Sequence, residues 1–245
     1  MSVLERFSAA QIHELAEQFE DTHPTEMLAW AAAHFGERAA IGTSFQGAGL
    51  VIIDLAVQAG LKLPVFTLDT GLLFPETVEL GRRLEDFFGI EIERIVPEQT
   101  VSEQAAEHGD ELWKRSPDLC CTLRKVLPLQ SKLAHLDVWI TGIRRQQSDT
   151  RQQTGVLELY QFDALREGYI LKLNPLANWS REQVREHIRI RGIPYNPLTD
   201  RGFRSIGCWP CTRAIGENDS ERAGRWTGFE KAECGIHTFL GKPQS

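Results

Sequence analysis

The sequence lacks any hydrophobic run that approaches the roughly 20 apolar residues of a membrane-spanning helix. Residues 1–15 carry charges early and contain no apolar core of the length found in signal peptides. We therefore expect a cytoplasmic protein that has no membrane partner. Thiols stay reduced in that compartment, so the cysteines are not expected to form disulfides.

Basic residues are fewer than acidic ones, with 27 Lys and Arg against 34 Asp and Glu, which gives a net charge of −7. This balance argues against broad nucleic-acid binding, and we expect no nucleic-acid partner. The sequence contains no internal repeat and no low-complexity segment. A length of 245 residues with 42% apolar content is typical of one large globular domain, or of one domain with an extension. The sequence leaves open whether the chain forms a homo-oligomer.

Only five cysteines occur, four of them in two close pairs and one standing apart. Cys120 and Cys121 are adjacent, and Cys208 and Cys211 have the CxxC spacing. Two close pairs of thiolates are a typical ligand set for a metal centre. Cys234 lies near the C-terminus in the sequence Glu-Cys-Gly-Ile-His, where a lone thiol beside a histidine is a candidate nucleophile. The pattern predicts a redox enzyme in which a metal centre supports the site and a single thiol reacts.

The spacing of the four paired cysteines favours an iron–sulfur cluster over a zinc ion. Adjacent side chains point apart in regular structure, so Cys120 and Cys121 are poorly arranged to bind one ion together. Structural zinc sites prefer a CxxC-like spacing on both sides. A 4Fe–4S cluster gives each thiolate a separate iron and accommodates adjacent ligands better. A zinc site, and a chain whose buried cysteines hold no metal, are the alternatives.

Alternating strand and helix patterns predict an α/β fold, Rossmann-like and doubly wound, whose mostly parallel sheet is covered on both faces. Helical spacing, Pro75 in a first turn and Ser180 as a cap predict four helices. The predicted helices cover residues 10–34, 50–59, 75–88 and 181–191. The predicted strands cover residues 39–45, 63–68, 91–96, 137–141, 156–161 and 169–173, with a turn at 163–168.

Three polar loops follow predicted strand ends, at residues 43–49, 69–71 and 141–151. Ligands bind beyond the carboxyl ends of parallel strands, so these loops are expected to line one crevice. The first loop runs into a helix and suits a phosphate, although it matches neither Walker A nor GxGxxG, and an ordinary strand–helix turn is its alternative. Asp69 is a candidate for holding ribose hydroxyls or an adenine edge, with a turn aspartate as the alternative.

Basic side chains gather at loop and motif positions of this acidic chain. They are Arg144, Arg145 and Arg151 in the third loop, Arg124 and Lys125 after the cysteine pair, and Arg222 and Arg225 before Trp226. Guanidinium groups suit bidentate recognition of phosphate or sulfate. The clustering favours an anion site over a solvated run of charge.

These motifs resemble the assimilatory sulfonucleotide reductases, and specifically the adenylyl-sulfate (APS) reductases that carry an iron–sulfur cluster. The resemblance extends from about residue 39 to the end of the chain. Phosphoadenylyl-sulfate (PAPS) reductases are similar in fold and tail but usually lack the four cluster cysteines. The resembling segments are residues 43–45, 68–71, 75–77, 120–125, 141–145, 205–213, 224–226 and 233–237.

The resemblance implies thioredoxin-dependent reduction of APS to sulfite and AMP, in sulfate assimilation and cysteine biosynthesis. Cys234 would attack the sulfate sulfur and carry a thiosulfonate, from which thioredoxin or a glutaredoxin-like protein would release sulfite. His237 would favour or orient the thiolate, with packing as its alternative role. Lys125 would connect the cluster region to the sulfate.

The resemblance also implies the site residues and the organisation of the chain. The fold would be adenine-nucleotide alpha-hydrolase-like, with an N-terminal helical segment at 1–38, a nucleotide-binding domain with the cluster site at 39–215, and a mobile tail at 216–245. The implied cluster ligands are Cys120, Cys121, Cys208 and Cys211. The implied substrate-binding residues are Thr43, Ser44, Asp69, Thr70, Gly71, Gly142, Arg144, Arg145, Arg151, Arg222 and Arg225.

Two departures from the family pattern stand out. The first loop usually reads Gly-Ala-Glu-Asp, whereas residues 47–50 read Gly-Ala-Gly-Leu, and residues 116–118 offer no histidine. PAPS, alone or together with APS, is an alternative substrate. An ATP-pyrophosphatase-type thiolation enzyme would want a Ser-Gly-Gly-x-Asp-Ser loop, which is absent, and a redox-sensing metal module would not need Cys234.

Overall fold

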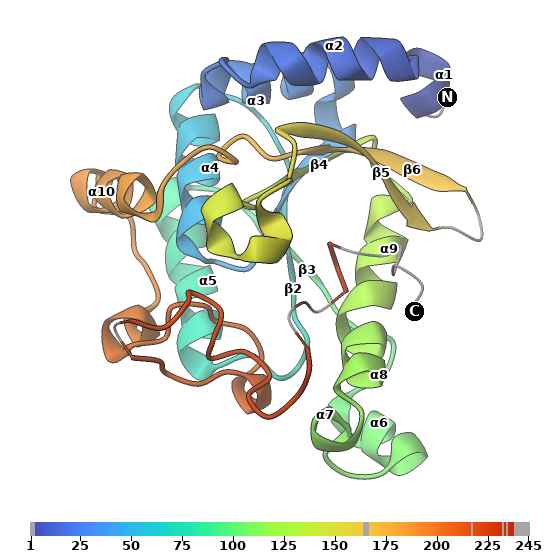
Figure 1. Ribbon diagram of the computed structural model, residues 1–245, viewed down its shortest axis with the longest axis vertical. Helices are drawn as coiled ribbons and strands as arrows, with labels where there is room; N and C mark the ends of the chain where they lie inside the picture. The colour runs from blue at the N-terminus through green and yellow to red at the C-terminus, as the bar shows by residue number, and fades with distance from the viewer. Residues whose placement is uncertain (1–2, 164–166, 217, 232, 234, 238–245) are drawn as a thin grey trace.

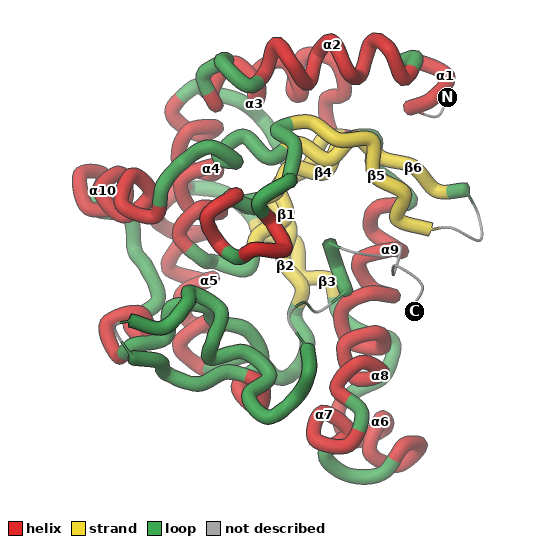
Figure 2. The backbone as a smooth tube through the Cα atoms, in the orientation of Figure 1, coloured by secondary structure: helices red, strands yellow, loops and turns green. Residues whose placement is uncertain are grey.

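A six-stranded, mostly parallel sheet forms the centre of the protein, as seen in the computed structural model, which describes residues 3–163, 167–216, 218–231, 233 and 235–237 (Figures 1 and 2). Its strand order is β3-β2-β1-β4-β6-β5, and only β5 runs antiparallel, to β6. The strands are β1 (Ala39–Thr43), β2 (Val65–Leu68), β3 (Ile92–Ile95), β4 (Val138–Thr141), β5 (Leu157–Asp163) and β6 (Gly168–Leu173). The predicted fold class is confirmed. The predicted turn at 163–168 includes residues 164–166, which lie outside the described part.

Helices cover both faces of this sheet and extend beyond it. The α-helices are α1 (Val3–Arg6), α2 (Ala9–Phe19), α3 (Pro24–Phe35), α4 (Gly47–Gln58), α5 (Pro75–Phe88), α6 (Val101–His108), α7 (Leu112–Arg115), α8 (Pro117–Cys121), α9 (Leu127–Leu133) and α10 (Arg181–Arg191). The short helical turns are η1 (Gly36–Arg38), the π-helix η2 (Thr122–Val126), η3 (Arg145–Gln147), η4 (Asp149–Arg151), η5 (Pro197–Arg201) and η6 (Trp209–Cys211). Within the described residues, no helix combines the length and the apolar character needed to cross a membrane.

The N-terminal region differs from the predicted single helix at residues 10–34. It forms two helices, because Ser8 begins α2 with a capping box to Gln11, and Pro24 begins α3 after the N-cap His23. The prediction of one helix was wrong because the apolar side chains keep a helical spacing on both sides of Pro24, where the second helix begins. The helices predicted at 75–88 and 181–191 are confirmed with the same bounds.

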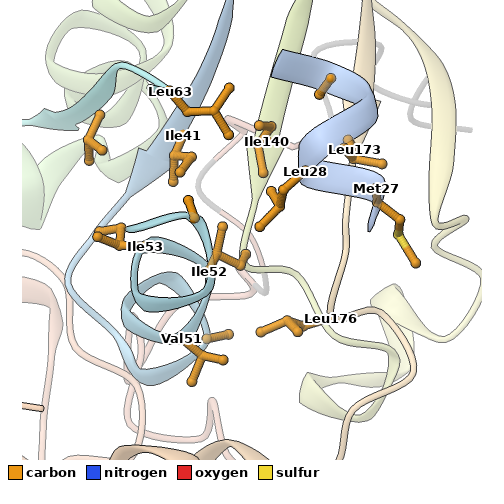
Figure 3. Close-up of a cluster of buried hydrophobic side chains, with 14 of the residues drawn as sticks. Met27, Leu28, Ile41, Val51, Ile52, Ile53, Leu63, Ile140, Leu173 and Leu176 are labelled. Carbon is orange, nitrogen blue, oxygen red and sulfur yellow. The ribbon is translucent and has the colours of Figure 1, made fainter. Parts of the chain in front are cut away.

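The hydrophobic core lies between the central strands and α4. Figure 3 shows Ile41 and Ile140 of the sheet facing Ile52 of α4, with Leu28 of α3 covering the same cluster. Strands that are buried on both faces read as continuous apolar runs, which is why the sequence located them well. On its outer side α4 is joined to α10 by Asp54, a buried carboxylate 2.8 Å from the Nε2 atom of His187.

The topology creates a crevice between β1 and β4, where the strand order reverses. The loop that follows β4 packs directly on the first turn of α4, since a Cβ atom on Gly142 would lie 2.9 Å from the backbone nitrogen of Gly49. A Cβ atom on Gly49 would itself lie 2.5 Å from Oγ1 of Thr43. Gly49 therefore occupies a position where a larger side chain would collide with Thr43. Because α4 already begins at Gly47, the first loop is shorter than predicted.

Residues 101–133 form a column of helices, α6 to α9, at one side of the sheet (Figure 1). The sequence analysis predicted no element here. A capping box between Thr100 and Glu103 begins α6, and Pro117 begins α8. The column carries Cys120 and Cys121 at the end of α8 and continues directly into the π-helix η2.

Candidate active site

The four paired cysteines meet around one small cavity. Cys120 and Cys121 end α8, while Cys208 and Cys211 lie at the two ends of the turn that contains η6. All four are free thiols, and all four line this cavity together with Lys125. Among the described residues, no three His, Cys, Asp or Glu side chains converge in the way that a single metal ion requires. The structure does bring the four predicted ligands to the lining of one small cavity.

Backbone contacts dock the CxxC turn against the end of β2. Trp209 donates its N–H to the carbonyl of Leu72 at 2.9 Å, beside an antiparallel bridge between Leu73 and Cys208. Thr212 closes the turn by donating its hydroxyl to the carbonyl of Cys208 at 2.9 Å. These bonds fix the two later cysteines against the loop that follows β2.

Burial and mutual repulsion act on the thiols unequally. Burial, followed by the neighbouring cysteines, raises the pKa of Cys120 to about 12. Burial and the charge of Cys208 likewise raise the pKa of Cys211 to about 11. Burial opposes ionisation of Cys208 too, but Lys125 and a hydrogen bond with Thr70 outweigh it and lower its pKa. Of these three thiols, Cys208 is therefore the best suited to the thiolate form.

Two buried cations follow the tandem cysteines within the π-helix. Arg124 donates to the backbone carbonyl of Thr70 and to Oε1 of Gln104 at 3.1 Å, and burial lowers the pKa of Arg124. Lys125, which is 8% exposed, lines both the cysteine cavity and a much larger cavity beside it. π-helical turns concentrate at functional sites, and this one turns both cations inward. Lys125 and Cys208 line both cavities, so the cysteine site and the larger cavity are adjacent.

The larger cavity lies at the carboxyl ends of the strands and has a volume of about 1160 Å³. It is the predicted crevice, and loops from all parts of the chain line it. The predicted site residues that line it are Thr43, Ser44, Thr70, Lys125, Gly142, Arg144, Arg151, Cys208, Arg222, Arg225 and His237. Asp69, Gly71 and Arg145 are not among its lining residues.

The structure gives these three residues other contacts. Asp69 accepts a hydrogen bond from the backbone of Gly71 at 3.0 Å, in a turn where Gly71 has a φ of +68°. Arg145 forms a two-pronged ion pair with Glu20 at 2.6 and 3.0 Å, which ties the loop after β4 to the end of α2. The alternative interpretation of Asp69 as a turn residue therefore agrees with its geometry.

Arg144 points the opposite way from its neighbour, into the cavity. Its side chain is buried, and its Nη2 atom lies 3.1 Å from a carboxylate oxygen of Glu221. The Nε atom is buried and has no hydrogen-bond partner among the described residues. A buried guanidinium with an unused donor can accept an anionic ligand without first breaking its ion pair.

Trp226 lies at the centre of the cations on the cysteine side of the cavity. Its ring is 2% exposed and packs against Cys121. The ring centroid is 4.5 Å from Cζ of Arg225, 5.5 Å from Nζ of Lys231 and 5.7 Å from Cζ of Arg222. Lys125 Nζ lies 6.0 Å away on the same ring. Such contacts hold cations in place by the ring's electron density. Sequence reasoning gave Trp226 no role, although it follows Arg225 in one of the family segments.

The end of the tail contacts the same cavity. Cys234, the predicted nucleophile, lies outside the described residues. His237 stacks on Trp139 at a centroid distance of 5.1 Å and an interplanar angle of 10°. Burial, and then the charges of Lys172 and Arg151, lower the pKa of His237 well below its usual range. The imidazole is therefore neutral at pH 7 and suited to stacking.

Comparison with known proteins agrees with this arrangement. Residues 38–214 match the phosphoadenosine phosphosulfate reductase domain. Similar proteins include an "Adenosine 5'-phosphosulfate reductase" of Salinibacter ruber, 40% identical over 95% of this chain and 90% of that protein. Another of that name, from Streptomyces coelicolor, is 41% identical over 96% and 99%. A "Phosphoadenosine 5'-phosphosulfate reductase" of Gloeobacter violaceus is 42% identical over 92% and 93%.

Solved structures show the same relationship. A phosphoadenylyl-sulfate (PAPS) reductase from Candida auris, in a phosphate complex, aligns with a TM-score of 0.73 and 32% identity. The alignment covers 84% of this chain and 98% of that one. An FMN adenylyltransferase from Candida glabrata shares the fold alone, with a TM-score of 0.56 and 14% identity over 91% of this chain and 77% of that one. The chain belongs to the phosphoadenosine phosphosulfate reductase family.

Proposed function

We propose that this protein is a cytoplasmic oxidoreductase that reduces adenylyl sulfate (APS) to sulfite and AMP, with a thioredoxin- or glutaredoxin-like dithiol as reductant. One observation carries the proposal: Lys125 lines both the cavity of the four thiols and the large cavity of the sheet edge. A cysteine centre and an anion site thus share one wall. Relatives named adenosine 5'-phosphosulfate reductase, about 40% identical over most of the chain, support it.

Cys120, Cys121, Cys208 and Cys211 would hold a 4Fe–4S cluster. The donor set fits, because four thiols surround a shared space and a cluster gives each thiolate its own iron. Lys125 and Arg225 act on Cys208 with positive charge, which offsets the negative charge of thiolate ligands. When bound, the cluster supplies a structural and electrostatic centre, since the electrons arrive as a dithiol.

The large cavity would hold the nucleotide, with its anionic groups toward the cations. Thr43 and Ser44 lie at the end of β1, where backbone N–H groups and the start of α4 favour a phosphate. Arg144 offers its buried Nε atom, and Arg225 projects over Gly207, where a Cβ atom would lie 2.2 Å from its Nη2 atom. The loops of β1 and β4 and the cations near Trp226 would therefore hold opposite ends of the ligand.

The reaction would proceed in two displacements at sulfur. The Cys234 thiolate attacks the sulfate sulfur, a new S–S bond forms, and the S–O bond to AMP breaks with the electron pair leaving on the phosphate. A dithiol thiolate then attacks Sγ of Cys234, and sulfite leaves with the electrons of the broken S–S bond. The second thiol of the reductant resolves the mixed disulfide and restores the Cys234 thiolate.

PAPS is the second candidate substrate. A relative of 42% identity and the structure aligned at a TM-score of 0.73 both carry PAPS reductase in their names. The four cysteines favour APS, because their presence is the feature by which the resemblance separates the two groups. Turnover of the two nucleotides by the same preparation decides between them.

The proposal is tested with protein purified without oxygen. We expect a brown protein with about four irons and four acid-labile sulfides per chain, and sulfite release from APS with reduced thioredoxin. Cys234→Ser is the matched variant, since it should keep the colour and lose turnover. A colourless wild type that carries zinc or no metal contradicts the cluster, and turnover by Cys234→Ser contradicts the covalent route.

A further inference from the structure

We propose that Glu233 is a positioning residue: its carboxylate binds Arg151 and Arg222 and so holds the chain next to Cys234 at the large cavity. The inference rests on the proposed function, because it concerns delivery of the nucleophile. It changes the expected role of the two arginines. Both were predicted to bind substrate, whereas their observed ligand is the chain itself.

The carboxylate of Glu233 is bound by the side chains of two arginines and one threonine. Arg151 donates from Nε and Nη2 to the two carboxylate oxygens, both at 2.9 Å. Arg222 donates from Nη2 to Oε2 at 3.0 Å, and Thr150 donates its hydroxyl to Oε1 at 3.4 Å. A fork-to-fork arginine–carboxylate pair fixes direction as well as distance.

This pair is shielded from water. The side chains of Arg151 and Glu233 are each 11% exposed, and that of Arg222 is 13% exposed. Burial alone raises the pKa of Glu233, but the hydrogen bonds and charges of Arg151 and Arg222 outweigh it, and the pKa falls below its usual range. Glu233 is therefore an anion at neutral pH and is not suited to act as a general base.

Arg151 and Arg222 come from separate parts of the chain. Arg151 ends η4, in the loop after β4, while Arg222 lies just before Trp226. One carboxylate thus joins the sheet edge to the cation cluster beside the cysteines. The ion pair lies at the wall of the large cavity, since Arg151, Arg222 and His237 all line it.

A second contact holds the chain on the other side of Cys234. His237 stacks on Trp139, and Tyr160 donates its hydroxyl to the carbonyl of Ile236 at 3.5 Å. A Cβ atom on Gly235 would lie 3.3 Å from a methyl group of Val126, in the π-helix. The chain is thus held by charge at Glu233 and by packing at residues 235–237. Only the charged side can be displaced by a free anion.

The experiment uses the cluster-loaded enzyme and two readouts. Iodoacetamide alkylation of Cys234, followed by peptide mass spectrometry, reports release of the tail without any substrate. Glu233→Gln should raise the alkylation rate by about tenfold, because losing one charge-assisted pair should make the released state of the tail about ten times more populated. It should lower kcat for APS by a similar factor and leave KM within about twofold, because positioning acts on the reaction rather than on binding.

Matched variants make the outcome specific. Glu20→Gln removes an equivalent two-pronged pair, with Arg145, outside the cavity, and should change neither readout. Glu233→Asp should recover part of kcat, and combining Glu233→Gln with Arg151→Gln should add little to either variant alone. If Glu233→Gln does not fold with its cluster, Arg151→Lys tests the same pair by removing the fork while keeping the charge.

Two results overturn the inference. Unchanged alkylation and unchanged kcat in Glu233→Gln mean that the pair does not hold the tail. A rise in KM alone, with unchanged alkylation, places Glu233 in substrate binding instead. Failure of the proposed function is separate, because it shows as a wild type that does not turn over APS or PAPS while the alkylation comparison still stands.

Discussion

Thr70 Oγ1 lies 3.2 Å from Sγ of Cys208, in a buried hydrogen bond that joins the end of β2 to the CxxC turn. The same hydroxyl accepts the N–H of Leu72 at 3.2 Å. Thr70 also lines the large cavity, so a single side chain contacts both the nucleotide side and the thiol side of the site.

We expect Thr70→Val to weaken the cysteine site without changing its shape. Loss of one buried hydroxyl costs about 0.5–1.5 kcal/mol per hydrogen bond. The measurements are the midpoint of thermal unfolding and the rate at which the visible absorption of the cluster is lost in the presence of a chelator. Thr70→Ser keeps the hydroxyl and should resemble wild type. Equal loss rates in the Val and Ser variants would contradict this role for the hydroxyl.

Lys125→Met should separate cluster retention from catalysis. The ammonium group acts on Cys208 from one side and lines the large cavity on the other. We expect kcat/KM for APS to fall by about 100-fold, as for loss of one charge that stabilises a transition state. Lys132→Met is the control, since Lys132 pairs with Glu93 away from the cavity. Retained turnover with full iron content would argue that Lys125 serves the thiols alone.

The histidine of the tail predicts a pH dependence. Because the pKa of His237 is lowered in the folded state, the unfolded chain takes up its proton first as the pH falls. Its contribution to stability is therefore fully present above the unfolded pKa of about 6.5 and is lost as the pH falls toward the folded value. The difference in unfolding midpoint between wild type and His237→Gln should therefore become smaller as the pH falls from about 7.5 to about 5.5. A difference that stays constant with pH would show that His237 does not change its protonation on unfolding.

The contact between the loop after β4 and the first turn of α4 predicts a cost for any side chain at Gly142. Gly142→Ala would press a methyl group against the backbone of Gly49 at 2.9 Å, and such overpacking costs about 1–3 kcal/mol. Calorimetry should show weaker AMP binding together with a lower unfolding midpoint. Gly60→Ala is the comparison, because Gly60 has a positive φ but no atom within 4 Å of the added Cβ. It should lower the midpoint and leave AMP binding unchanged.

The sheet could be predicted from the sequence because its central strands are buried on both faces. Ile41, Val138 and Leu171 belong to short apolar runs, which are typical of strands buried on both faces of a parallel sheet. The helices between β3 and β4 were missed, since residues 101–133 carry weak periodicity and their helices depend on caps such as Thr100. The break between α2 and α3 was signalled by Pro24 and overlooked.

The residue types that make up the site could be predicted from the sequence, but the direction in which each side chain points could not. The cysteine pattern identified four thiols that do meet, because chemistry-bearing residue types are visible in a sequence. Arg144 and Arg145 look equivalent there, yet one enters the cavity and the other pairs with Glu20. Glu233 belongs to a segment that resembles the family, but its ion pairs could not be predicted, since Arg151 and Arg222 are brought to it only by the folded chain.

The position of the cysteine pairs in the chain sets the order in which the protein matures. Cys120 and Cys121 are made before β4, whereas Cys208 and Cys211 follow β6 and α10. Contacts between such distant segments form late in folding, because the intervening chain must first find its place. All six strands have therefore been synthesised before the four thiols can meet. A centre that uses all four thiols can be completed only after Cys211 has been added to the chain.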